Sequence, residues 1–216
     1  MASFLRLQLL GLLVAEVMMV GMESLTVETG DGVKLHARLF KPAEPPANDL
    51  VVVFVHPYTV LGGSQGLLKG IATGLAERGF RVVTFDMRCA VRASLFGSAE
   101  IQDAIAVCKW VSNTLAPRDI ILVGSSAVNV GMGCNGEACW VLQLPAVDKI
   151  DQVVGYISIG YPFGLMASIL FGRHQEAILK SEKPKLFIMG NRDQLQRRQP
   201  PDRRSWPFSD GRVLRC

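Results

Sequence analysis

Histidine and cysteine are both scarce, since the 216 residues include three histidines and five cysteines. The number of cysteines is odd, and no spacing between them matches a zinc-ligand pair or a dense disulfide framework. We therefore expect no metal and no other cofactor. We interpret the cysteines as buried or free thiols of a protein in a reducing compartment, the cytoplasm. They are Cys89, Cys108, Cys134, Cys139 and Cys216.

An excess of one charge is lacking from most of the chain. The net charge is +4, but residues 1–190 are balanced, and the excess comes from residues 191–216, with seven arginines and three aspartates. Nucleic-acid binding needs a basic face on a suitable fold, so we expect no nucleic-acid partner. Hydrophobic residues make up 49% of the sequence and charged residues 19%. This composition excludes overall disorder and predicts one domain with a sizeable core.

The chain begins with an apolar stretch from Phe4 to Val20, interrupted only by Arg6, Gln8 and Glu16. A signal peptide or a membrane anchor has such a run, but Glu16 divides it and no clean cleavage site follows. The other interpretation is that Met22 is the natural start and residues 1–21 are an extension. We therefore expect no membrane association, with secretion or anchoring as the alternative if residues 1–21 act as a signal.

The rest of the chain alternates strands with helices. Strands are predicted at Thr26–Thr29, Val33–Phe40, Leu50–His56, Arg81–Asp86, Asp119–Val123, Val153–Ile159 and Lys185–Met189. Helices are predicted at Leu67–Glu77 and after Ser98, where Ile101, Ala104, Ile105, Cys108, Val111 and Leu115 repeat at helical spacing. This order predicts an α/β fold, a mostly parallel sheet with helices on both faces. Such sheets place their chemistry at the carboxyl ends of the strands.

The first motif lies at the end of the strand Leu50–His56. It runs from His56 to the pair Gly62 and Gly63. A strand that leads into a His-Pro turn and a glycine pair is typical of half an oxyanion hole. A free backbone N–H there, that of Tyr58, would donate to a developing oxyanion. The alternative is an ordinary loop in which His56 makes a local hydrogen bond.

The second motif is Gly124-Ser125-Ser126 at the end of a strand. It resembles the nucleophile elbow G-x-S-x-G, in which a tight turn presents the serine hydroxyl and the next N–H, here that of Ala127, completes the oxyanion hole. Val128 replaces the last glycine of that motif. The alternative is a serine-rich loop after a strand.

The third motif is Asp193, which follows the strand Lys185–Met189 after a short loop. An aspartate in this position supplies the acid of a Ser…Asp…His triad. The alternative is an aspartate that caps a helix or a turn.

The segments LVVVFVHPYTVLGG, RVVTFDMR, DIILVGSSA and KPKLFIMGNRD, in this order, closely resemble a group of α/β-hydrolases well represented in plants. Their relatives are often described as serine aminopeptidase-like or dipeptidyl-peptidase-like. The resemblance covers residues 22–193. It implies an eight-stranded sheet with Ser126 as the nucleophile and Asp193 as the acid, and a histidine after a further strand and helix.

The chain departs from this pattern in three places. The segment after Arg88 lacks the family's glycine-rich loop, residues 128–145 replace the expected helix, and residues 194–216 contain no strand signal. We interpret the last two segments as translated non-coding or frame-shifted sequence and the chain as a truncated or mis-spliced version. The domain is then 22–193, followed by a basic, disordered tail, 194–216. The C-terminal strand and helix are missing, and Lys185–Met189 becomes an edge of the sheet.

No histidine follows Asp193, because the three are His36, His56 and His174. Without a base the serine hydroxyl is a weak nucleophile near neutral pH. One hypothesis is a serine hydrolase of ester, thioester or amide bonds that takes a small-molecule or peptide acyl substrate. The second is a non-catalytic protein of the same fold, favoured for the chain as written. A nucleotide-binding protein is disfavoured, because the G-x-G-x-x-G of residues 131–136 does not directly follow a strand.

Overall fold

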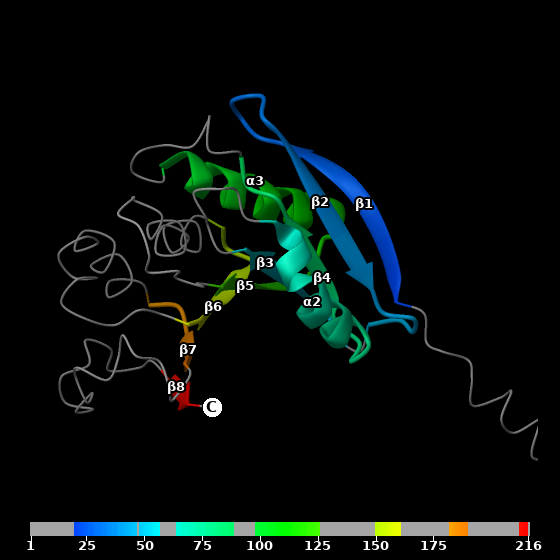
Figure 1. The fold of residues 1–216 in the computed structure, drawn as a ribbon, viewed down its shortest axis with the longest axis vertical. Helices are drawn as coiled ribbons and strands as arrows, with labels where there is room; N and C mark the ends of the chain where they lie inside the picture. The colour runs from blue at the N-terminus through cyan, green and yellow to red at the C-terminus, as the bar shows by residue number, and fades with distance from the viewer. Residues whose placement is uncertain are drawn as a thin grey trace, which may run out of the picture.

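The computed structural model describes residues 20–46, 48–56, 64–88, 98–125, 150–160, 182–189 and 212–215. In these residues one sheet has the strand order β1-β2-β4-β3-β5-β6-β7-β8 (Figure 1). The strands are β1 (Gly21–Glu28), β2 (Lys34–Lys41), β3 (Leu50–Val55), β4 (Arg81–Phe85), β5 (Asp119–Ser125), β6 (Val153–Ile159), β7 (Lys185–Met189) and β8 (Arg212–Arg215). The helices are η1 (Gln65–Leu68), α2 (Lys69–Ala76) and α3 (Ser98–Thr114).

The sheet is mostly parallel, as the sequence predicts. Strands β4, β3, β5, β6, β7 and β8 pair with their neighbours in parallel, whereas β1 pairs antiparallel to β2, and β2 antiparallel to β4. The β1–β2 connection turns at Gly32, whose positive φ of 79° is a conformation that suits glycine. Because β2 runs against β4, the start of β2 lies at the carboxyl end of β4.

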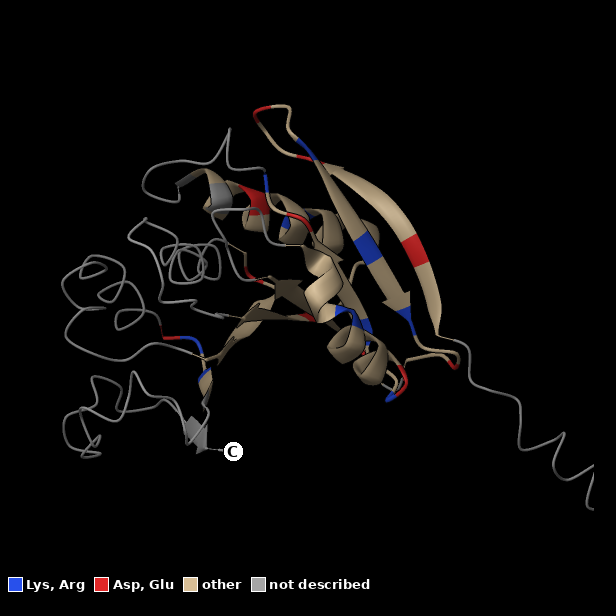
Figure 2. Ribbon diagram, in the orientation of Figure 1, with Lys and Arg blue, Asp and Glu red and all other residues tan. Residues whose placement is uncertain are grey.

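The two faces of the sheet are covered by different helices. In β3, Val51, Val53 and Val55 belong to a core cluster with α3, whereas Val52 and Phe54 belong to a second cluster with α2. This alternation follows from the two-residue period of a strand. The ribbon of β3 carries no charged residue, in contrast to β1 and β2 (Figure 2). A strand that is apolar along its whole length is expected between two covered faces.

Helix α3 buries the face that its sequence pattern predicts. Ala104, Ile105, Cys108 and Val111 are buried in its core cluster, and Ile101 and Leu115 pack against them partly buried. Burial raises the pKa of the Cys108 thiol to about 12. The predicted helix 67–77 is observed as η1 followed by α2, so it begins two residues earlier.

The expectation that β7 forms an edge of the sheet is wrong. Strand β8 pairs with β7 from Leu186↔Arg212 to Met189↔Arg215, and Phe187 of β7 is fully buried. Strand β8 shows no apolar alternation in the sequence, because it has only four residues and its pairing depends on backbone groups. Residues 194–211, expected to be disordered, lie outside the described residues.

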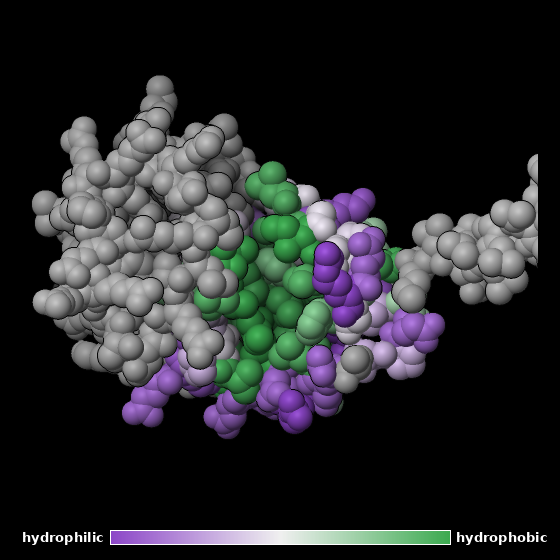
Figure 3. Space-filling view, turned by 90° about the horizontal axis from the view of Figure 1, so that it is seen from below, coloured by the Kyte–Doolittle hydropathy of each residue, from purple (hydrophilic) through white to green (hydrophobic). Residues whose placement is uncertain are grey.

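An apolar area remains on the face of the sheet that carries α2. Leu67 and Ile71, one helical turn apart, are 67% and 47% exposed. Ile121, Ile157 and Ile159 pack against the cluster under α2 and are only partly buried. Figure 3 shows a continuous apolar area on the molecule seen from below. Within the described ranges, no helix has the length and apolar character to cross a membrane.

The burial of β7 generates a stability prediction. Replacing Phe187 by alanine should lower the free energy of unfolding by about 3–5 kcal/mol, because it removes a large buried side chain and leaves a cavity. The matched control is Val154→Ala in the neighbouring strand β6, where the side chain is 40% exposed and the loss should stay below about 1 kcal/mol. Urea unfolding measures both, and equal losses would show that β7 is not buried.

Candidate active site

The carboxyl ends of four strands meet at one edge of the sheet. Val55, the last residue of β3, is paired with both Phe85 of β4 and Gly124 of β5. Ser125, the last residue of β5, is paired with Ile159 of β6. The residues that follow these strands therefore emerge side by side, which is where sheets of this kind place their chemistry.

Most of the predicted site residues lie outside the described residues. These are Tyr58, Gly62, Gly63, Ser126, Ala127 and Asp193. The structure describes the strands that lead to them: β3 leads to the first three, β5 ends directly before Ser126, and β7 precedes Asp193. Ser125, at the end of β5, is therefore the described residue next to the predicted nucleophile. Val55, at the end of β3, marks where the chain leaves the sheet toward the predicted oxyanion loop.

His56 is the one predicted site residue that the structure describes. It is 3% exposed, and its Nε2 accepts a hydrogen bond of 3.2 Å from the backbone N–H of Met87. A nitrogen that accepts from an N–H carries no proton, so a neutral ring holds its proton on Nδ1. The lone pair of Nε2 is engaged by this bond and is not available to take a proton from a serine.

Gln65 begins η1, at the other end of the loop that follows β3. It is 1% exposed, and its backbone N–H donates to Oδ1 of Asp86 at 2.7 Å. Its side-chain Nε2 donates to Oδ2 of Asp86 at 2.8 Å and to the backbone oxygen of His36 at 3.1 Å. Its Oε1 accepts from the Thr84 hydroxyl at 2.7 Å. A buried amide with so many partners fixes this loop end.

Asp86 follows β4 and is surrounded by donors. Burial alone would raise its pKa, but the hydrogen bonds from the backbone and the side chain of Gln65 outweigh burial and lower it. The backbone N–H of Asp86 donates to the His36 oxygen at 2.9 Å, and its Oδ2 lies 3.5 Å from His36 Nδ1. Asp86 is therefore a carboxylate that connects β2, β4 and η1.

Arg88 forms a buried ion pair with Asp103 of α3. The exposed fractions of the two side chains are 5% and 0%. The Arg88 Nη2 donates to Asp103 Oδ1 at 2.6 Å, its Nε to the same oxygen at 2.9 Å, and its backbone N–H to Asp103 Oδ2 at 2.9 Å. These hydrogen bonds raise the pKa of the guanidinium above its ordinary value, so Arg88 keeps its positive charge.

Asp31 in the β1–β2 turn supplies the second carboxylate that pairs with Arg88. Its Oδ2 accepts from Arg88 Nη1 at 2.8 Å, and its side chain is 56% exposed. The hydrogen bonds from Arg88 and then from Thr29 lower the pKa of Asp31 to about 2. One arginine thus joins the turn between β1 and β2, the end of β4 and helix α3.

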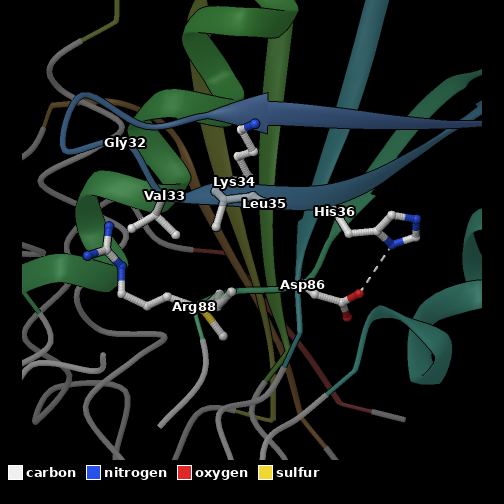
Figure 4. Close-up of a pocket in the computed structure, with 8 residues that line it drawn as sticks. Gly32, Val33, Lys34, Leu35, His36, Asp86 and Arg88 are labelled. Atoms are coloured by element: carbon white, nitrogen blue, oxygen red, sulfur yellow. Dashed lines mark ion pairs between the residues drawn. The ribbon is translucent and has the colours of Figure 1, made fainter. Parts of the chain in front are cut away.

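A shallow pocket lies beside these groups. It is lined by Gly32, Val33, Lys34, Leu35 and His36 from the start of β2 and by Asp86, Met87 and Arg88 from the end of β4 (Figure 4). In Figure 4 the His36 ring points toward Asp86, and Arg88 extends away from both. His36 is half exposed, as its place on the polar side of β2 predicts. The described residues contain no cluster of three or more potential metal ligands.

The site residues predicted from the sequence do not include Gln65, Asp86, Arg88 or Asp103. The available signal was a charged pair, Asp86 and Arg88, directly after a buried strand, and an acidic residue among the apolar positions of a predicted helix. A buried acid of this kind needs a partner, but sequence spacing does not identify which arginine supplies it.

The Arg88–Asp103 pair generates a second prediction. Asp103→Asn should lower the free energy of unfolding by about 3–5 kcal/mol, because it leaves the Arg88 charge buried without its main partner. The control is Asp31→Asn, which removes the exposed partner of the same arginine and should cost much less. Urea unfolding at neutral pH measures both, and equal losses would contradict the central place of Asp103.

The lowered pKa of Asp31 generates a pH prediction. Because its folded value of about 2 lies below the ordinary value of 3.8, its stabilising effect is complete above that ordinary value and is lost as the pH falls toward 2. The urea midpoint of Asp31→Asn should therefore lie below that of the unmodified chain at pH 6, and the two should converge by pH 2. A constant difference across this range would refute the prediction.

The structure is similar to solved structures of serine hydrolases and esterases. An esterase from Pyrococcus furiosus has a TM-score of 0.61 and 17% identity, over 91% of this chain and 82% of that chain. An α/β serine hydrolase homologue from Coxiella burnetii has a TM-score of 0.64 and 20% identity, over 91% and 88%. A serine hydrolase without a lid from Xanthomonas campestris has a TM-score of 0.65 and 21% identity, over 90% and 83%.

The sequence comparisons are negative, because no protein-family model and no curated protein matches this sequence. The structural likeness covers about 90% of this chain, whose sheet is mostly parallel with helices on both faces. This chain has the α/β-hydrolase fold.

Proposed function

We propose that this chain is a serine hydrolase that acts on ester, thioester or amide bonds through Ser126. In this proposal Asp193 is the acid, and the backbone N–H groups of Tyr58 and Ala127 form the oxyanion hole. The substrate is a small-molecule or peptide acyl compound. The same proposal places the chain in the group of α/β-hydrolases, well represented in plants, whose relatives are described as serine aminopeptidase-like or dipeptidyl-peptidase-like.

The observation that carries the proposal is the end of β5. This strand lies inside the sheet between β3 and β6 and ends at Ser125, with Gly124 paired with Val55 of β3. A serine directly after such a strand and next to the loop after β3 has the arrangement of a nucleophile elbow beside an oxyanion hole. The esterase from Pyrococcus furiosus and the hydrolase from Xanthomonas campestris share the fold, which supports this assignment.

The reaction is an acyl transfer in two steps. The Ser126 oxygen attacks the carbonyl carbon, and the two N–H groups stabilise the negative oxygen that develops. The leaving group departs with a proton, which gives an acyl-serine. Water then attacks the same carbon, releases the carboxylic acid and restores the hydroxyl.

The base that should take the serine proton has no candidate among the described histidines. His56 Nε2 already accepts from Met87, and His36 lies on β2 against Asp86 and Gln65. In these 216 residues no histidine follows Asp193. We therefore propose slow turnover, of the order that remains when a triad loses one member, about 10³–10⁴-fold above the reaction in water.

A second function follows from the same observation. A protein of this fold without a base could bind an acyl compound without turning it over. The two functions differ in one measurable property, because only the hydrolase has a rate that depends on the Ser126 hydroxyl.

The test is hydrolysis of p-nitrophenyl acetate by the purified chain, by Ser126→Ala and by the matched control Ser125→Ala. We expect a slow rate that falls further in Ser126→Ala, while staying above the buffer rate, and that persists in Ser125→Ala. A rate equal in all three proteins would favour the binding protein. A fast rate that is lost in His174→Ala would refute the proposed impairment.

A further inference from the structure

We propose that the two consecutive residues Asp86 and Met87 hold both ends of the loop 57–63, so that Asp86 and His56 are positioning residues for the oxyanion hole. The role of the loop rests on the proposed function above. Its attachment does not, because that follows from contacts of the described residues alone.

The first end of the loop is attached through His56. Val55 pairs with Phe85 in the parallel strands β3 and β4, so the next residues, His56 and Asp86, leave the sheet together. The hydrogen bond from the Met87 N–H to His56 Nε2 then joins the two segments one residue further on. The ring is 3% exposed, so water cannot readily replace this bond.

The second end is attached through Gln65, nine residues later. Both oxygens of Asp86 accept from Gln65, one from its backbone N–H and the other from its side chain, at 2.7 and 2.8 Å. A carboxylate suits this place because it has only acceptors. An asparagine there would keep one acceptor oxygen, but its NH2 group would face one of the two N–H donors of Gln65.

The attachment points are themselves fixed. Asp86 donates its N–H to the His36 oxygen in β2, and the next residue but one, Arg88, is bound to Asp103 of α3 by its backbone and its side chain. Both loop ends therefore depend on one short segment, and a displacement of that segment moves them together. An oxyanion donor displaced by about 1 Å can cost on the order of 100-fold in rate.

The variants are designed to separate position from general stability. Asp86→Asn disrupts the attachment at Gln65, and His56→Leu removes it at Met87, whereas His56→Gln can restore an acceptor near Nε2. The control is Asp49→Asn at the opposite edge of the sheet. Asp49 also accepts from one backbone N–H, that of Arg118 at 2.9 Å, and from one side chain, that of Arg81 at 2.7 Å.

The first readout is amide hydrogen exchange of the full chain by NMR, which needs no activity. We expect exchange at the Gln65 amide to rise about tenfold or more in Asp86→Asn, and exchange at the Met87 amide to rise similarly in His56→Leu, with recovery in His56→Gln. Asp49→Asn should leave both amides unchanged. Unchanged exchange at these amides in Asp86→Asn and His56→Leu would overturn the attachment.

The second readout is the rate at which a fluorophosphonate probe labels Ser126, measured by peptide mass spectrometry. We expect this rate to fall about tenfold or more in Asp86→Asn and His56→Leu, to recover in His56→Gln, and to stay the same in Asp49→Asn. Faster amide exchange with an unchanged labelling rate would overturn the positioning role. Absence of Ser126 labelling in the unmodified chain would instead overturn the proposed function, and the exchange data would still decide the attachment.

Discussion

The ion pair between Arg88 and Asp103 is the interaction on which the arrangement of the site depends. Two nearly inaccessible charges can remain buried only because each meets the other through several hydrogen bonds. This requirement fixes the segment after β4 against α3, and the second arm of the guanidinium brings in Asp31 from the β1–β2 turn. The segment after β4, helix α3 and the β1–β2 turn are thus tied together by one side chain.

The order of the strands explains how three neighbouring residues reach so many partners. Strand β4 lies between β2 and β3, and β2 runs in the opposite direction, so the start of β2 and the end of β3 both lie at the carboxyl end of β4. Asp86 faces the η1 side, the backbone of Met87 faces His56, and Arg88 reaches α3. One strand end therefore holds together the described part of the candidate site.

The sequence predicted those features that depend on local pattern. The apolar run of β3 and the apolar positions of α3 identify their elements, because a period of two or of 3.6 is visible within one segment. The pairing of Arg88 with Asp103 is not visible in this way, since it joins residues 15 positions apart that come together only when α3 packs on the sheet. Strand β8 was missed because four residues are too few to show a period. Of the predicted site residues only His56 is described; it accepts a hydrogen bond from the Met87 N–H, and its place in an oxyanion loop stays a prediction.

The contacts of Asp86, Met87 and Arg88 also have a consequence for the order of folding. The hydrogen bonds described above join these three residues to partners between Asp31 and Asp103. During synthesis the N-terminal part of a chain leaves the ribosome first, but a domain generally folds as a unit. The partners that Asp86, Met87 and Arg88 need for these hydrogen bonds are therefore all synthesised before β5, whereas the core around Met87 is complete only when β5, β6 and β7 have followed.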